Sequence, residues 1–231
     1  MLKPRLRFFS PSDVRHALAT TPLTRLLSLG ERELFRQLDV PRRRHDWLAG
    51  RLAAKAVVRD AVGCRDGEAP PHSAISILNA ADGAPYVVVE DRPELSGEFN
   101  ISIAHHDGFA VAALAHTARW GFVGVDLEWD RPLADRLLRR VLTTEERHRL
   151  ETNERGIAPP NMALWSLKEA VLKASRDAAR ISMRHVDLSW DRRGRIAARI
   201  LDRSSEGVRV SATWRRHGAH VLAYAICRPV S

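Results

Sequence analysis

Hydrophobic and polar positions change their period along the chain, and the changes predict long helices followed by strands. Apolar residues recur at helical spacing over 23–38 and 45–62. In the second half, Thr143-x-x-Glu146 is a capping box that predicts a helix through about Glu154, and another helix starts after Pro160. Strand-like runs follow in each half, at 75–78, 86–89, 99–103, 109–115, 186–190, 196–200, 208–214 and 220–226.

The two halves of the chain read alike, since each has a long helix followed by two hairpins with glycine in their turns. We therefore expect an α+β protein of two similar subdomains, 1–118 and 119–231, each with a long helix packed on antiparallel strands. An overlay of the helices pairs Trp47 with Trp165, Lys55 with Lys173, Ala56 with Ala174 and Arg51 with Glu169. Such a duplication predicts a pseudo-twofold relation, with the active site in the cleft between a basic first and an acidic second subdomain.

Carboxylates interrupt an apolar strand in the second half. In a strand alternate side chains point the same way, so Asp126 and Glu128 share one face while Val123, Val125 and Leu127 fill the other. The alternative interpretation of such an acidic pair is a strand face that is exposed to solvent. The apolar surroundings favour a central strand instead, where exposed carboxylates are unusual.

A second charged pair lies on the helix that follows Pro160. Glu169 and Lys173 are four residues apart and therefore adjacent on one side, and apolar residues lie on both flanks of Glu169. A plain helical salt bridge is the alternative interpretation. Together with Asp126 and Glu128, the pair supplies three carboxylates and an ammonium, which suits Mg²⁺ bound to a phosphate-bearing substrate.

The amino-acid composition limits the kinds of partner that the protein is expected to bind. The chain has 231 residues, is 45% hydrophobic, and carries 37 Lys and Arg against 28 Asp and Glu, a net charge of +9. This surplus favours an anionic partner: nucleic acid, an acidic protein or a phosphorylated cofactor. Cys64 and Cys227 form no C-x-x-C motif, and neither a signal peptide nor a membrane-spanning run is evident. We expect a cytoplasmic protein that is not bound to a membrane.

The acidic segments resemble a known family. Gly-Val-Asp-Leu-Glu at 124–128, followed about forty residues later by Trp-Ser-Leu-Lys-Glu-Ala-Val-Leu-Lys-Ala at 165–174, is similar to the paired signature of 4′-phosphopantetheinyl transferases. The segments 141–145, 47–51 and 99–105 support the resemblance, which covers most of the chain. Chain length and the apparent duplication indicate the monomeric, two-subdomain Sfp-type branch.

The resemblance implies roles for individual residues. Asp126, Glu128 and Glu169 would hold Mg²⁺, or Mn²⁺, against the pyrophosphate of coenzyme A, the substrate. Glu169 and Lys173 would be catalytic, with Glu169 as general base directly or through water. The coenzyme would be bound by Arg44, Arg51, His105, Asp126 and Lys173. The acceptor would be a serine of an acidic apo carrier protein, and the coproduct adenosine 3′,5′-bisphosphate.

Two departures from the family pattern affect coenzyme binding. Ala104 stands where the family usually has Ser, and Ala84 stands where Lys is frequent. A coenzyme- or carrier-binding relative with weak or no turnover is therefore one alternative. A nucleic-acid-binding protein is the other, suggested by the arginine content, although no zinc-finger spacing or RNA-binding motif accompanies it. Neither the carrier nor tolerance of acyl-coenzyme A follows from the sequence.

Overall fold

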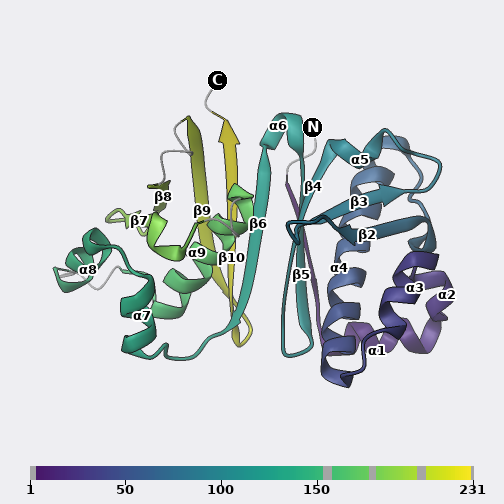
Figure 1. The fold of residues 1–231 in the computed structure, drawn as a ribbon, viewed down its shortest axis with the longest axis horizontal. Helices are drawn as coiled ribbons and strands as arrows, with labels where there is room; N and C mark the ends of the chain where they lie inside the picture. Colours follow the sequence, from purple (N-terminus) through teal and green to yellow (C-terminus); the bar gives the residue numbers. More distant parts are fainter. Residues whose placement is uncertain (1–3, 153–157, 177–180, 202–206, 230–231) are drawn as a thin grey trace. The chain divides into compact units, whose positions relative to one another are not determined.

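The computed structural model describes residues 4–152, 158–176, 181–201 and 207–229 and divides into two compact units. Unit 1 is Met1–Trp120 and unit 2 is Gly121–Ser231 (Figure 1). Each unit combines a long helix with antiparallel strands, so the predicted α+β class is confirmed. The predicted end of the helix near Glu154 lies outside the described residues.

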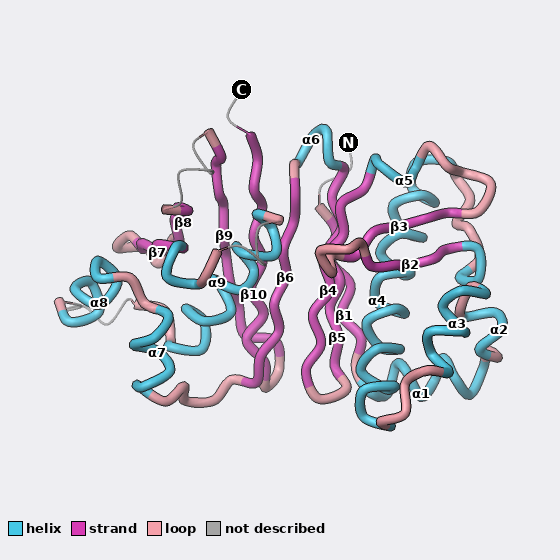
Figure 2. Tube along the Cα trace, in the orientation of Figure 1, coloured by secondary structure: helices cyan, strands magenta, loops and turns pink. Residues whose placement is uncertain are grey.

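In unit 1, the long helix α4 (Pro41–Asp66) packs against a sheet of order β1-β5-β4, and a separate hairpin pairs β2 with β3. The buried face of α4 and the inward faces of these strands form one hydrophobic core. Figure 2 shows α1 and α3 beside the lower part of α4, which they contact. The remaining elements are β1 (Arg5–Phe9), α1 (Pro11–Thr20), α2 (Leu23–Leu26), α3 (Leu29–Arg36), η1 (His72–Ala74), β2 (Ile75–Asn79), β3 (Pro85–Val89), α5 (Leu95–Glu98), β4 (Phe99–His106), β5 (Phe109–His116) and α6 (Thr117–Trp120).

In unit 2, the helix α9 (Asn161–Ser175) lies across a five-stranded sheet of order β6-β10-β9-β8-β7. All the pairings are antiparallel, and a second hydrophobic core lies between α9 and this sheet. The other elements are β6 (Phe122–Trp129), α7 (Asp135–Val141), α8 (Thr144–Glu151), η2 (Met183–His185), β7 (Val186–Trp190), β8 (Ile196–Ile200), β9 (Val208–His217) and β10 (His220–Pro229). The strand runs and the capping box predicted for this half are confirmed.

Most of the segment 23–38, where helical spacing predicted helix, is helical, but it is divided into α2 and α3 with a break at Ser28. Ser28 accepts a hydrogen bond from the Glu31 amide, and the Glu31 carboxylate accepts one from the Ser28 amide, so a new helix starts there. The strand β1 was not predicted, although basic and apolar residues alternate along it. No helix among the described residues has the length and apolar character to cross a membrane.

The two units share the order of one strand, short helices, a long helix and four strands, although unit 1 has more short helices. The overlay of their long helices is wrong by five positions. Lys55 of α4 makes the same kind of contacts as Lys168 of α9, so Lys168 and not Lys173 is its counterpart. Lys55 and Lys168 are each buried against the glutamate of a capping box. The place of Lys173 is taken by Asp60, which is as far from Lys173 in the sequence as Lys55 is from Lys168.

A second ion pair fixes this alignment. Asp60 pairs with Arg7 of β1, and Lys173 pairs with Asp126 of β6, so the same helix-to-strand contact occurs with its charges reversed. Ala56 of unit 1, and not Arg51, therefore corresponds to Glu169. Asp126, Glu128 and Glu169, called the acidic cluster below, therefore belong to unit 2. The predicted pseudo-twofold relation and shared cleft stay predictions.

Candidate active site

Strand β6 and helix α9 approach each other so closely that their backbones touch. A Cβ atom added at Gly124 would lie 1.9 Å from the carbonyl oxygen of Ala170 and 2.6 Å from the amide nitrogen of Ala174. Only glycine fits this position. Because side chains alternate along a strand, Asp126 and Glu128 share the face of Gly124 and point toward the helix.

The accessible surface of α9 is one narrow stripe. Over residues 161–174 every side chain is buried except Asn161, Trp165, Glu169 and Lys173, which recur at every fourth position and are half-buried. The helix is therefore largely enclosed, in agreement with the apolar residues on both flanks of Glu169. Glu169 and Lys173, predicted to be catalytic, are two of the four positions on this stripe; Ser175, at the end of α9, is also half-buried.

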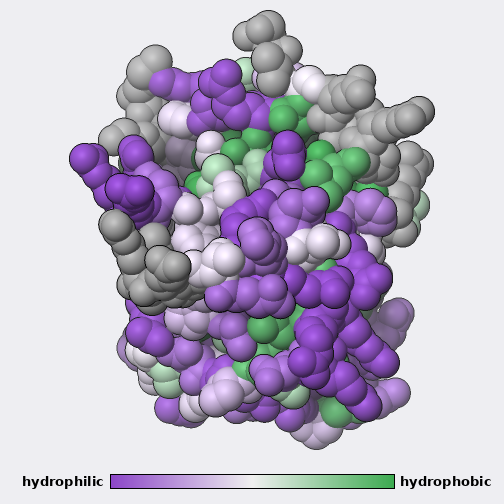
Figure 3. All heavy atoms as spheres, turned by 90° about the vertical axis from the view of Figure 1, so that its left-hand side faces the viewer, coloured by the Kyte–Doolittle hydropathy of each residue, from purple (hydrophilic) through white to green (hydrophobic). Residues whose placement is uncertain are grey.

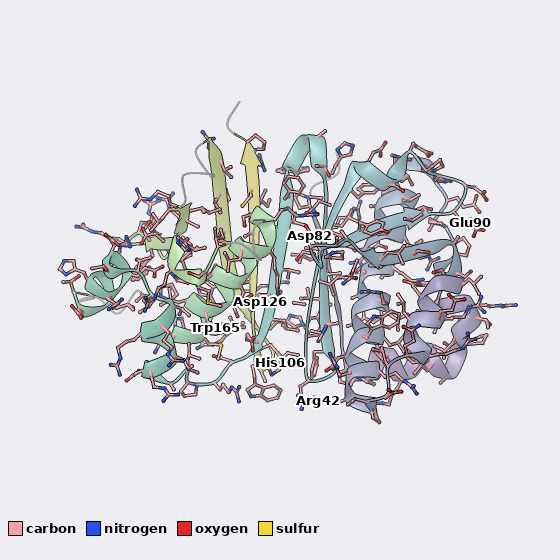
Figure 4. All side chains as sticks on the ribbon, in the orientation of Figure 1. Arg42, Asp82, Glu90, His106, Asp126 and Trp165 are labelled. Carbon is pink, nitrogen blue, oxygen red and sulfur yellow. The ribbon has the colours of Figure 1, made fainter. Side chains whose placement is uncertain are left out.

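An ion pair joins the helix to the strand. The ammonium of Lys173 donates to Asp126 Oδ1 at 2.8 Å and to the carbonyl oxygen of Val125 at 3.1 Å. Asp126 is only 5% exposed, and its other oxygen, Oδ2, is buried with no hydrogen-bond partner among the described residues. Figure 4 shows Asp126 on β6 beside α9. A buried carboxylate oxygen without a partner is costly unless something else satisfies it.

Glu169 belongs to the same electrostatic environment. Burial raises the pKa of the Glu169 carboxyl above its ordinary value, the negative charges of Asp126 and Glu128 raise it further, and Lys173 partly offsets them. Asp126 and Glu128 thus act on Glu169 as like charges, and Lys173 acts on it as the opposite charge.

This donor set fits a hard divalent cation, which takes oxygen ligands and tolerates an excess of carboxylates. The described residues contain no group of three acidic, histidine or cysteine side chains already arranged to hold a metal. The unsatisfied Oδ2 of Asp126 and the raised pKa of Glu169 are nevertheless what a site for a positive ligand would show.

The raised pKa of Glu169 predicts how stability depends on pH in a chelating buffer. The folded protein keeps this proton to a higher pH than the unfolded chain, so native stability falls as the pH rises from 4.5, the ordinary pKa, through the raised value. Glu169→Gln removes this loss. We expect its gain in unfolding free energy to be small in acid and larger at neutral pH, measured by urea denaturation. A gain independent of pH would contradict the raised pKa.

Unit 1 contains a cavity of about 760 Å³ that includes two of the predicted coenzyme-binding residues. Arg51 is 8% exposed, donates to Asn79 Oδ1 at 2.9 Å, and lies 4.7 Å from the centre of the Trp47 ring. His105 is exposed at the rim. The lining residues are Leu34, Gln37, Leu38, Trp47, Gly50, Arg51, Leu78, Asn79, Gly83, Pro85, Tyr86, Ile103 and His105.

Arg44 is not among the described residues that line this cavity. Its Nε donates to the carbonyl oxygen of Leu38 at 2.9 Å, and its guanidinium lies 5.3 Å from the centre of the Phe35 ring. These contacts tie the start of α4 to the end of α3. The structure thus brings Arg51 and His105 to one cavity and gives Arg44 a different neighbourhood.

Comparison with known proteins identifies the family. Residues 122–225 match the model of the 4′-phosphopantetheinyl transferase superfamily. A holo-[acyl-carrier-protein] synthase of Geobacillus sp. is 33% identical over 90 residues, which are 39% of this chain and 72% of the relative. The chain belongs to the 4′-phosphopantetheinyl transferase superfamily. A phosphopantetheinyl transferase of Thraustochytrium sp. is 28% identical over 186 residues, and the alignment spans 74% of this chain but only 60% of that relative.

The matched region of this superfamily member contains both the strand and the helix of the acidic cluster. Among solved structures, a holo-(acyl-carrier-protein) synthase from Bacillus anthracis in complex with CoA (3′,5′-ADP) is 24% identical, with a TM-score of 0.39 over 48% of this chain and 91% of that one.

Sequence reasoning missed the role of Gly124 and the partners of Arg51. A lone glycine between Val123 and Val125 in a strand is a recognised sign of close backbone approach, so that signal was available. No comparable signal joins Arg51 to Asn79, because the hydrogen bond links a helix to a hairpin 28 residues away. The position of Arg51 could only come from the fold.

Proposed function

We propose that this chain transfers the 4′-phosphopantetheine group of coenzyme A to a serine of an apo carrier protein and releases adenosine 3′,5′-bisphosphate. The observation that carries the proposal is the ion pair between Lys173, on the accessible stripe of α9, and the buried Asp126 of β6, whose charge also acts on Glu169. Phosphoryl transfer requires positioning and charge neutralisation more than covalent help from the enzyme. Family membership supports the same activity.

Mg²⁺, or Mn²⁺, is proposed to be held by Asp126, Glu128 and Glu169. When bound, the ion would polarise the diphosphate and offset the negative charge that develops on it. Lys173 already occupies Oδ1 of Asp126, so Oδ2 is the oxygen of this residue that has no other partner among the described residues. Each carboxylate is anchored on a regular element, which restricts its movement.

Glu169 and Lys173 are proposed to move protons and charge during transfer. The serine oxygen forms a bond to the β-phosphorus, and the bond from this phosphorus to the bridging oxygen of the diphosphate breaks. Glu169 accepts the serine proton, directly or through water. Lys173 neutralises the leaving phosphate and can protonate it.

The cavity of unit 1 is proposed to bind the nucleotide portion of coenzyme A. Arg51 offers a guanidinium for a phosphate, and Tyr86 and Trp47 offer flat surfaces in the same cavity. Ala84 and Ala104, the two departures from the family pattern, are not among its described lining residues.

An acidic carrier protein is proposed to dock on helix α7 of unit 2. Leu138 and Val141 are buried, while Arg136, Arg139 and Arg140 are exposed beside Leu137, which is 40% exposed. Figure 3 views the end of unit 2 that includes α7, and its lower half is mostly hydrophilic. Basic side chains around an exposed leucine complement an acidic helical partner that has its own apolar contact.

Charge reversal on α7 tests this docking. Arg139→Glu with Arg140→Glu is expected to raise the KM for the carrier roughly tenfold or more and to leave kcat nearly unchanged, because electrostatic attraction accelerates encounter. The matched control is Arg192→Glu with Arg193→Glu, two exposed arginines in the β7–β8 turn of the same unit. Equal effects of both reversals on the KM would contradict docking at α7 and indicate a response to net charge.

The activity itself is tested by mass spectrometry of a panel of apo acyl, peptidyl and aryl carrier proteins incubated with coenzyme A and Mg²⁺. Gain of one phosphopantetheine on a carrier serine is the expected result. Binding of carrier or coenzyme without any mass gain would instead identify a relative that has lost turnover. Tight binding to arbitrary duplex DNA with no modification of any carrier would favour the nucleic-acid alternative.

Several finer properties are proposed on the sequence alone. These are membership of the Sfp-type branch, a monomeric state and a cytoplasmic location. The basic surface, with a net charge of +9, agrees with an acidic protein partner, and no nucleic acid is required to account for it.

A further inference from the structure

A buried lysine adjoins the acidic cluster on helix α9. Lys168, next to Glu169 in the sequence, is 0% exposed, and its ammonium lies 2.7 Å from Glu146 Oε2. The same ammonium donates to the carbonyl oxygens of Met183 at 3.0 Å and Val186 at 2.5 Å. A lysine has three donors, and all three are satisfied here.

Glu146 is equally well satisfied, and it joins three elements. Its Oε1 accepts from the amide of Leu188 in β7 at 2.7 Å, and its Oε2 accepts from the amide of Thr143 at the start of α8 at 2.7 Å. The Lys168–Glu146 pair therefore links α9 to the start of α8 and to β7. A fully bonded buried ion pair permits one arrangement of the elements that it joins.

Unit 1 contains the same device at an equivalent place. Lys55 of α4 is 0% exposed, lies 2.5 Å from Glu31 Oε2, and donates to the carbonyl oxygens of His72 and Ile75 at 2.7 and 2.6 Å. Glu31 Oε1 accepts from the amide of Ile77 at 3.0 Å. The functional residue near each lysine differs. Lys168 directly precedes Glu169, whereas Lys55 lies one helical turn after Arg51, which lines the cavity of unit 1.

The position of Lys168 decides what its anchoring controls. Successive residues of an α-helix differ in direction by about 100°, so a small rotation or shift of α9 would turn Glu169 and Lys173 away from Asp126. The close approach at Gly124 sets the distance between helix and strand, and the rotation of α9 about its axis depends on the contacts of its buried side chains. The three bonds of Lys168 supply such a contact one residue from Glu169.

We propose that Lys168 is a positioning residue of the active site: its buried pair with Glu146 fixes the rotation of α9 and so holds Glu169 and Lys173 against Asp126. Lys55 acts in the same way on Arg51 in unit 1. The inference rests on the proposed transfer function. Lys168 and Lys55 make the same kind of contacts, but Lys168 is expected to affect kcat and Lys55 the KM for coenzyme A.

The experiment compares Lys168→Met with Lys55→Met in the full chain, with coenzyme A, an apo carrier and Mg²⁺. Both changes leave a buried glutamate without its cation, so both lower the midpoint of urea denaturation. Lys168→Met is expected to lower kcat about 100-fold with little change in the KM for coenzyme A, as misplaced catalytic groups do. Lys55→Met is expected to raise that KM and to change kcat little.

Two further measurements separate positioning from stability. Lys168→Met with Glu146→Gln removes the uncompensated charge, and we expect its denaturation midpoint to recover toward the wild type while kcat stays low. If Lys168→Met does not fold, this double variant replaces it. The affinity for Mn²⁺, measured by calorimetry, is expected to fall in the Lys168 variants and to be unchanged in Lys55→Met.

The proposal is overturned if Lys168→Met and Lys55→Met give the same split between kcat and KM, or if kcat recovers together with stability in the double variant. Wild-type protein that modifies no carrier would instead refute the proposed function. In that event the Mn²⁺ affinities still decide the positioning role, because they require no turnover.

Discussion

Asp126→Asn is expected to lower kcat for phosphopantetheine transfer by about 10³-fold or more, the loss that follows removal of one charged group from a preorganised phosphoryl-transfer site. The amide can still accept the hydrogen bond of Lys173, so the fold is retained. The lost group is the anionic oxygen Oδ2, which has no other partner among the described residues. Steady-state rates of carrier modification, with circular dichroism to verify folding, measure the effect.

The matched control for this change lies on the loop that directly follows β6. Asp130→Asn removes a carboxylate that pairs with Arg216 at 2.6 Å and does not enter the electrostatic environment of Glu169. We expect its kcat to remain within a few-fold of the wild type. Wild-type rates in Asp126→Asn, or equal losses in the two variants, would remove this carboxylate from the mechanism.

Gly124→Ala is expected to cost about 3 kcal/mol or more of the free energy of unfolding and to abolish transfer. Overpacking of a core typically costs about 1–3 kcal/mol, and here the obstacle is backbone that cannot move aside. A Cβ atom would lie 1.9 Å from the carbonyl oxygen of Ala170, so the strand and the helix would have to separate. Separation would also break the ion pair of Asp126 and Lys173. Urea denaturation and the carrier assay measure the two effects.

Gly30→Ala is the control for a glycine-to-alanine change as such. Gly30 lies in α3, where an added Cβ would meet nothing within 4 Å, so the variant should be as stable as the wild type or more stable by up to about 1 kcal/mol. A Gly124→Ala protein of unchanged stability would show that β6 and α9 are farther apart than described here.

Much of the fold could be predicted from local signals. The strands β7 and β8 were predicted at their observed bounds, and the α8 capping box was read from Thr143 and Glu146 alone. Glycine marks the turns at Gly83, Gly194 and Gly218, all of which adopt positive φ. Such features depend on residues close in the sequence, so a single chain is enough to reveal them.

The alignment of the two halves could not be predicted, because it depends on contacts between distant residues. A shared Trp and Lys suggested one overlay of the helices, whereas the buried partners Glu31 and Glu146 establish another. Both glutamates were visible in the sequence, and Glu146 was already assigned to a capping box. The sequence did not indicate that each of these carboxylates also pairs with a buried lysine.

The chemistry of the acidic cluster was predictable in part. Alternation placed Asp126 and Glu128 on one strand face, and four-residue spacing placed Glu169 beside Lys173. The sequence could not show that Lys173 pairs with Asp126, 47 residues away. That contact turns two separate local patterns into one site.

The central claim is that carboxylates from β6 and α9 hold one divalent cation between them. Its most direct test is calorimetric titration of Mn²⁺ into the coenzyme-loaded protein, comparing wild type with Asp126→Asn and Glu169→Gln. We predict one ion bound per wild-type chain and no measurable binding in either variant. Unchanged stoichiometry and affinity in both variants would contradict the claim.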